Sequence, residues 1–217
     1  MADCPDTLTL YTNPMSRGRI ARWMLEEVGA PYDTVLVDYG APMQGAAYRA
    51  VNPMRKVPAL VHERAGARST VTECAAICAY LADAFPAAGL APPLPGRGAY
   101  YRWLFFAAGP LEAAVTNAAL GVEVPPDKRG FVGYGDLAAV TDTLEQAVSA
   151  APHVAGDAFS AADVYVGSHV GWGLQFGTIE RRPAFEAYWS RLEARPAHSR
   201  AAGLDDAAMA AAASPSG

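Results

Sequence analysis

A segment dense in proline and glycine, AAGLAPPLPGRG at residues 87–98, divides the chain into two parts with different patterns. All segments that predict a β-strand come before it, whereas the rest of the chain is rich in alanine and helical in pattern. Such a segment is typical of a linker, because neither residue type readily continues a helix or a strand. We therefore expect an α/β domain over residues 1–86, a linker over 87–98 and an all-α helical-bundle domain over 99–217.

Strand-like and helix-like segments alternate at the start of the chain. TLTLY at residues 7–11 predicts a strand, SRGRIARWMLEEVG predicts a helix with Ser16 as its N-cap, and residues 32–37 predict a second strand. Strand, helix and strand in this order form a βαβ unit, whose two strands are parallel neighbours.

A hairpin is predicted next. Residues 57–62 and the segment STVT flank a turn that contains Gly66, and a helix capped by Thr72 should follow and end before Pro86. Together with the βαβ unit, this pattern predicts a mixed four-stranded sheet with helices.

Bulk properties argue against several functional classes. The formal net charge is −5 and no run of Lys or Arg could grip a phosphate backbone, so no nucleic-acid binding is expected. No apolar run reaches the roughly 20 residues of a membrane span, and the N-terminus has no apolar signal-peptide region. The cysteines, Cys4, Cys74 and Cys78, have the spacing of neither a disulfide framework nor a metal site. We expect a cytoplasmic protein without a metal.

Four segments, in this order, resemble the bacterial cytosolic glutathione S-transferases: LYTNPMSRGRIARWMLEEVGAPY, NPMRKVPAL, TECAAICAYL and AGDAFSAADVYVGSHVGWGLQFG. The resemblance covers roughly residues 8–201. It implies a thioredoxin-like N-terminal domain, a helical C-terminal domain, a homodimer and a transferase of detoxification that uses glutathione as co-substrate.

Pro58 stands at the start of a predicted strand, although proline cannot donate a ladder hydrogen bond. The resemblance implies that the Val57–Pro58 peptide bond is cis and that the backbone of Val57 faces outward. An extended peptide can pair with such a backbone edge, and the resemblance assigns this place to the cysteinyl unit of glutathione.

The resemblance also implies a group that ionises the glutathione thiol. A free thiol has a pKa of about 8.5, and lowering it by about two units stabilises the thiolate by about 2.7 kcal/mol. Ser16 can act through its hydroxyl and through the N-terminal end of the predicted helix. A serine at an N-cap is also common without catalysis, and Tyr11 is the alternative hydroxyl. TNPMSRGR contains no cysteine, which argues against mixed-disulfide chemistry.

Further glutathione-binding residues follow from matching positions. Glu73 and Cys74 stand where the family usually carries Glu-Ser, so Glu73 is expected to pair with the γ-glutamyl ammonium and the Cys74 amide with its carboxylate. Lys56 is expected to meet the glycyl carboxylate and Arg17 to assist the thiolate. Each charged side chain could instead be a solvated surface group, and Glu73 could serve the helix dipole. Arg55 is a departure, because glycine is frequent there.

Aromatic residues crowd the first helix after the linker. Tyr100 and Trp103 would share a face, and with Tyr11 they are the candidates to line a pocket for a small hydrophobic electrophile. Two other readings stay open. The chain could bind glutathione without turnover, or it could be a related glutathione-dependent dehalogenase, isomerase or peroxidase.

The segment SAAD at residues 160–163 is a capping-box variant, to which we assign a structural role.

Overall fold

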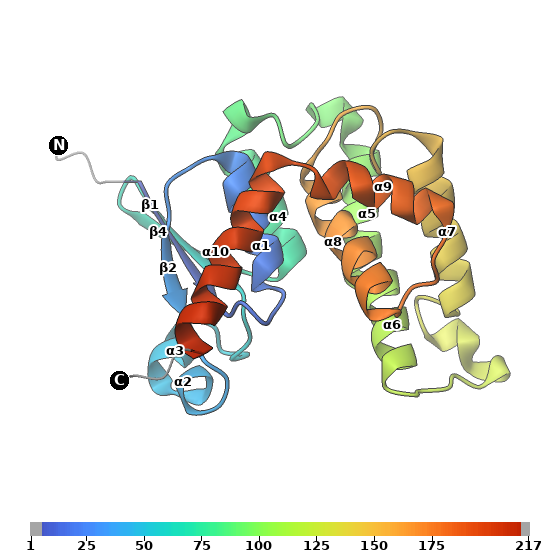
Figure 1. Cartoon of the computed structure of the whole chain (residues 1–217), viewed down its shortest axis with the longest axis horizontal. Coiled ribbons are helices and arrows are strands. Elements are labelled where there is room, and N and C mark those ends of the chain that lie inside the picture. Colours follow the sequence, from blue (N-terminus) through green and yellow to red (C-terminus); the bar gives the residue numbers. More distant parts are fainter. Residues whose placement is uncertain (1–5, 214–217) are drawn as a thin grey trace. The chain divides into compact units, whose positions relative to one another are not determined.

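The computed structural model describes residues 6–213. The elements follow in this order: β1 (Thr7–Thr12), α1 (Gly18–Val28), β2 (Asp33–Leu36), α2 (Ala41–Gln44), α3 (Ala46–Val51), β3 (Ala59–Arg64), β4 (Ala67–Thr72), α4 (Cys74–Ala84), η1 (Pro86–Ala88), η2 (Leu94–Gly96), α5 (Arg97–Phe106), η3 (Ala107–Leu111), α6 (Glu112–Ala119), η4 (Pro126–Phe131), α7 (Leu137–Ala150), α8 (Ala161–Phe176), α9 (Pro183–Glu193) and α10 (Pro196–Ala213) (Figure 1). Within the described range, no helix combines the length and the apolar character that crossing a bilayer requires.

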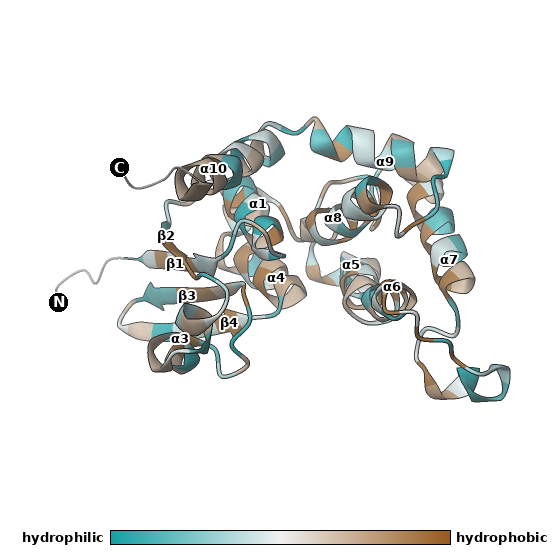
Figure 2. Ribbon diagram, turned by 60° about the horizontal axis from the view of Figure 1, so that its bottom comes forward, coloured by the Kyte–Doolittle hydropathy of each residue, from teal (hydrophilic) through white to brown (hydrophobic). Residues whose placement is uncertain are grey.

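The chain forms two compact units. Residues up to Ala88 together with those from Arg195 onward make the first unit, and Gly89–Ala194 make the second. The first unit holds the sheet, α1–α4 and α10, and the second is helical. The predicted C-terminal domain over 99–217 includes α10, whereas this grouping puts α10 in the first unit, where it packs along α1 (Figures 1 and 2). α5 begins at Arg97, inside the predicted linker.

The sheet has the strand order β2-β1-β3-β4. β1 and β2 are parallel, while β1–β3 and β3–β4 are antiparallel, so the predicted mixed four-stranded sheet is confirmed. The hairpin between β3 and β4 turns on Ala65 and Gly66, whose φ angles are 51° and 80°. Positive φ at both central residues is typical of a type I′ turn, which matches the twist of the flanking strands.

The side chains of β1 alternate between two faces of the sheet. Leu8, Leu10 and Thr12 are buried on one face, where α1 packs. Tyr11 points to the opposite face and packs against a small cluster built by Val37, Met43 and Tyr48. The period of two along a strand produces this division, which the sequence predicted.

Two predicted helix starts are wrong by one or two residues. α1 begins at Gly18 with Arg17 at the N-cap position, so Ser16 is not the N-cap. α4 begins at Cys74 with Glu73 at the N-cap position, so Thr72 is not the cap. Thr72 is the last residue of β4 and pairs with Ala59 in the sheet, and this pairing keeps it in extended backbone.

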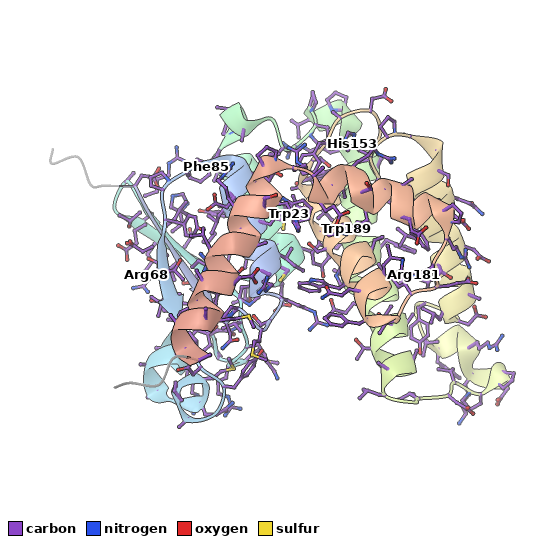
Figure 3. All side chains as sticks on the ribbon, viewed as in Figure 1. Trp23, Arg68, Phe85, His153, Arg181 and Trp189 are labelled. Carbon is purple, nitrogen blue, oxygen red and sulfur yellow. The ribbon has the colours of Figure 1, made fainter. Side chains whose placement is uncertain are left out.

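α10 is held on α1 by polar as well as apolar contacts. Arg22 and Asp205 form an ion pair of 2.9 Å, with side chains only 5% and 0% exposed. Burial raises the pKa of Asp205, and the charge of Arg22 opposes this shift. Trp23, which is labelled in Figure 3, lies edge-on to His198, with the centroids of the two rings 4.8 Å apart. The C-terminal helix is thus fixed to the first helix of the first unit.

The helical unit is organised around α8. A methyl group at Gly171 of α8 would lie 2.7 Å from the ring of Trp189 on α9, so only glycine lets the two helices approach this closely (Figure 3). The predicted capping box is confirmed at the start of α8. The buried carboxylate of Asp163 accepts hydrogen bonds from the backbone N–H groups of Val154 and Ser160 and from the hydroxyl of Tyr188, at 2.8–2.9 Å.

Replacing Asp163 should cost folding stability, because it leaves several buried donors without an acceptor. We expect Asp163→Ala to lower the free energy of unfolding by about 3 kcal/mol or more. Asp136→Ala is the matched control, because Asp136 caps α7 through the N–H of Ala139 in an exposed position. Removal of this cap should lower the free energy of unfolding by about 1 kcal/mol. Denaturant unfolding measures both values, and equal losses would contradict the role of the buried network.

Candidate active site

The register of three strands brings three separate segments to one edge of the sheet. Tyr11 of β1 pairs with Ala59 of β3, and Ala59 pairs with Thr72 of β4. The residues next to these pairs therefore also lie at this edge. They are the turn after β1, the residues before Ala59 and the start of α4. These segments contain the predicted catalytic Ser16 and all the predicted glutathione-binding residues: Arg17, Lys56, Val57, Pro58, Glu73 and Cys74.

Asn13 organises the turn after β1. Its side-chain amide donates to the carbonyl of Val37 at 3.1 Å, and its side-chain oxygen accepts from the N–H of Met15 at 2.9 Å. Its backbone carbonyl accepts from the N–H of Ser16 at 3.1 Å. The sequence pattern Asn-Pro signals a turn. The bond to Val37 depends on the sheet, so the sequence analysis did not identify Asn13 as a site residue.

The hydroxyl of Ser16 is engaged on both sides. It donates to the carbonyl of Asn13 at 2.6 Å and accepts from the N–H of Gly18 at 2.9 Å. A serine hydroxyl has only one proton, so it can donate to a ligand sulfur only by leaving the Asn13 carbonyl. That carbonyl would keep the backbone N–H of Ser16 as a partner. The exchange therefore leaves no buried acceptor unsatisfied.

Gly18 permits a close approach of α1 to the end of β1. A methyl group at Gly18 would lie 1.9 Å from the hydroxyl oxygen of Thr12, which is fully buried. No side chain can be accommodated there without moving the strand or the helix. Gly18 thus fixes how near the start of α1 lies to the sheet edge.

The Val57–Pro58 peptide bond is cis, as the resemblance implied. β3 itself begins two residues later than predicted, at Ala59. Within the described residues, the backbone N–H and C=O of Val57 take part in no hydrogen bond. The edge expected to receive a peptide backbone is therefore open in the structure.

The carbonyl of Lys56 anchors the segment before Val57. It accepts from the hydroxyl of Tyr48 at 2.6 Å and from the side-chain amide of Asn52 at 2.8 Å. Burial raises the pKa of Tyr48 to about 12, so this hydroxyl stays protonated and donates throughout the neutral range. The side chain of Lys56 is exposed.

Arg55, just before Lys56, has a φ of 55°. The left-handed region costs a residue with a Cβ atom, which explains physically why glycine suits this position.

The start of α4 closes the site on the side of β4. Glu73 is exposed and has a φ of 66°, an uncommon backbone conformation for a residue other than glycine. The thiol of Cys74 donates to the carbonyl of Arg17 at 3.4 Å. This bond places the start of α4 against the start of α1. It also directs the Cys74 thiol at the protein, so only the backbone amide remains for the expected carboxylate contact.

The candidates for the electrophile pocket belong to two different units. Tyr11 is half-buried on the sheet face away from α1, with its ring 5.9 Å from that of Tyr48. Tyr100 and Trp103 belong to α5 of the helical unit, where both are buried. The ring of Trp103 is covered by the guanidinium of Arg102 at 4.5 Å. Their proposed role at a pocket stays a prediction.

Cys78, the other described cysteine, is buried in α4, and burial raises the pKa of its thiol well above its usual value. Cys4 lies outside the described residues. Over residues 6–213, no three His, Cys, Asp or Glu side chains are grouped so that they could hold a metal ion.

Residues 15–84 match the family model of the glutathione S-transferase N-terminal domain. A search of curated proteins gives no match.

Solved structures match over almost the whole chain. A glutathione transferase from Methylococcus capsulatus strain Bath is 29% identical, with a TM-score of 0.75 over 93% of this chain and 100% of that chain. A sphingomonad glutathione S-transferase complexed with glutathione is 28% identical, with a TM-score of 0.71 over 91% of this chain and 98% of that one. A beta-class enzyme from Sphingomonas chungbukensis is 27% identical, with a TM-score of 0.70 over 91% and 98%. Residues 15–84 thus match the N-terminal domain of the glutathione S-transferases, and the chain shares its fold with these bacterial enzymes.

Proposed function

We propose that this protein is a glutathione transferase, which binds glutathione along the edge at Val57 and conjugates its thiolate to small hydrophobic electrophiles. The single observation that carries the proposal is the arrangement at the sheet edge. An open backbone at Val57 lies between the Ser16 turn and the strained Glu73, and all three segments are fixed by the strand register. The matched family and the glutathione-bound sphingomonad relative support this proposal at the level of the family.

Each part of the tripeptide has a proposed partner. The backbone of the cysteinyl unit pairs with Val57 next to Pro58, and the γ-glutamyl ammonium pairs with Glu73 while its carboxylate takes the N–H of Cys74. Lys56 meets the glycyl carboxylate. Arg17 is exposed beside the Ser16 turn and adds positive charge near the sulfur.

Thiol ionisation is assigned to Ser16. On binding, its hydroxyl turns from the Asn13 carbonyl to the sulfur and donates a hydrogen bond that favours the thiolate. The thiolate then attacks the electrophilic carbon. The new carbon–sulfur bond forms as the leaving group departs with its electron pair, and the thiol proton has gone to solvent. Tyr11 is the alternative donor, and Tyr100 and Trp103 are proposed to line the electrophile pocket.

One observation favours a second candidate, glutathione binding without turnover. The protons of the Ser16 hydroxyl and of the Cys74 thiol are both donated to backbone carbonyls of the protein. If neither is released, the site holds the tripeptide without ionising it. The homodimer, the cytoplasmic location and the role in detoxification also stay predictions, as do the dehalogenase, isomerase and peroxidase activities.

Replacement of Ser16 tests the proposed mechanism. We expect Ser16→Ala to lower kcat/KM with a chlorodinitrobenzene-type electrophile by tenfold to about a hundredfold, because the thiol pKa rises by one to about two units. Ser69→Ala, at an exposed position of β4, is the control and should keep wild-type activity.

The outcome separates the candidates. Full activity of Ser16→Ala would refute the role of Ser16 and assign thiol ionisation to Tyr11 or to backbone donors. Calorimetric binding of glutathione by a wild-type protein that turns over no aryl halide, dihalide or peroxide would establish the binding protein instead.

Truncated ligands test the two charged contacts. Glu73→Gln should weaken glutathione binding about tenfold but leave the affinity for cysteinylglycine, which lacks the γ-glutamyl unit, unchanged. Lys56→Ala should weaken glutathione but not γ-glutamylcysteine, which lacks the glycyl carboxylate. Calorimetric titration measures the affinity of wild type and of each variant for glutathione and for the corresponding truncated ligand. Glu63→Gln, on the exposed end of β3, is the control. If a variant loses as much affinity for its truncated ligand as for glutathione, the assigned contact is contradicted.

A further inference from the structure

The guanidinium of Arg19, on the first turn of α1, contacts two distant parts of the first unit at once. Its Nε donates to the carbonyl of Pro14 at 2.6 Å. Its Nη2 donates to the carboxylate of Asp206 at 2.6 Å and lies 3.3 Å from the sulfur of Met209. Pro14 belongs to the turn that carries Ser16, whereas Asp206 and Met209 belong to α10.

We infer that Arg19 is a positioning residue that couples the Ser16 turn to the C-terminal helix, so that α10 sets the geometry of the thiol-activating turn. The inference rests on the proposed function, because it concerns the same site. Arg19 itself is not assigned any contact with the ligand.

The turn has other restraints besides Arg19, which include a hydrogen bond from the hydroxyl of Tyr39 to the carbonyl of Met15 at 3.2 Å. Asn13 ties its first residue to Val37, and the Ser16 hydroxyl returns to the same Asn13 carbonyl. Pro14 has no N–H, so its carbonyl is its only backbone hydrogen-bonding group, and Arg19 holds that carbonyl. Loss of this bond removes one restraint from the turn beside Ser16, whose hydroxyl has to face the sulfur.

The planar fork of arginine is what allows this double contact. Nε and Nη2 diverge from one rigid group, so a single side chain reaches the turn on one side and α10 on the other. The ammonium of lysine is a point charge on a flexible stem and cannot reproduce both bonds in fixed geometry. The Arg19 and Asp206 side chains are 27% and 66% exposed, so the pair itself adds little to global stability.

A second α1–α10 ion pair provides a matched control. Arg200 of α10 contacts the Glu26 carboxylate at 3.1 Å and donates to the Glu26 carbonyl at 3.1 Å. This pair likewise joins an arginine to the other helix and reaches a backbone carbonyl, although the side chain of Arg200 is more exposed than that of Arg19. It lies near the C-terminal end of α1 and makes no bond to the Ser16 turn.

For Asp206→Ala, a purely electrostatic role and a positioning role of Arg19 predict opposite changes in the pKa of the bound thiol. Removal of the Asp206 carboxylate leaves the positive charge of Arg19 uncompensated, and a purely electrostatic role would lower the pKa of a bound thiol. A positioning role predicts that the thiol pKa rises, because the turn is released from α10.

The experiment compares wild type with Arg19→Lys, Asp206→Ala and the control Arg200→Lys. The thiol pKa of bound glutathione is measured by the ultraviolet absorbance of the thiolate across pH, and kcat/KM is measured with the aryl electrophile. Amide hydrogen exchange at Ser16 and Gly18 is measured without ligand. We expect Arg19→Lys and Asp206→Ala to raise the thiol pKa, to lower kcat/KM about tenfold and to accelerate exchange at the turn, with Arg200→Lys unchanged.

The two proposals can fail separately. A wild-type protein that does not ionise bound glutathione refutes the proposed function, while exchange at Ser16 and Gly18 still decides whether α10 holds the turn. If wild type ionises the thiol but Arg19→Lys and Asp206→Ala keep its pKa and the turn's exchange rates, the coupling is refuted. A lowered thiol pKa in Asp206→Ala refutes positioning in favour of charge.

Discussion

The register of β3 between β1 and β4 is the constraint on which the rest of the site depends. Backbone hydrogen bonds fix Ala59 opposite both Tyr11 and Thr72, so three turns distant in sequence reach the same edge of the sheet. A slip of one residue would turn every side chain of the strand to the other face. The hairpin at Ala65 and Gly66 prevents this slip between β3 and β4, because a two-residue loop fixes the pairing of the strands it joins.

Two polar side chains at this edge, those of Ser16 and Cys74, already bond to the protein itself. Ser16 and Cys74 donate to backbone carbonyls, and these bonds bind the starts of α1 and α4 to their surroundings. A ligand that recruits the serine hydroxyl has to compete with a bond of the turn, whereas the backbone of Val57 is open from the start. Binding through the backbone of Val57 therefore breaks no hydrogen bond of the protein, whereas activation of the thiol by the Ser16 hydroxyl does.

The path of the C-terminal helix adds a second constraint. α10 returns to the first unit and packs along α1, held by the buried pair of Arg22 and Asp205 and by the bidentate contact of Arg195 with Glu27 at 2.6 and 2.7 Å. The helix that begins at the Ser16 turn is therefore fixed along its length by a segment from the other end of the chain. Exposed pairs add little to this attachment, while the buried pair would be costly to break on one side only.

The amino-acid sequence by itself determined the alternation of strands and helices, the hairpin around Gly66, the capping box at Ser160 and the edge proline at residue 58, because each follows from the preferences of residues close together in the chain. The tertiary structure decided the start of α1 at Gly18, the approach of Gly18 to Thr12 and the return of α10. Arg19 and Asp206 meet across 187 positions of sequence. No local preference encodes such a contact, since it exists only once the sheet register and the packing of helices have fixed where both residues lie.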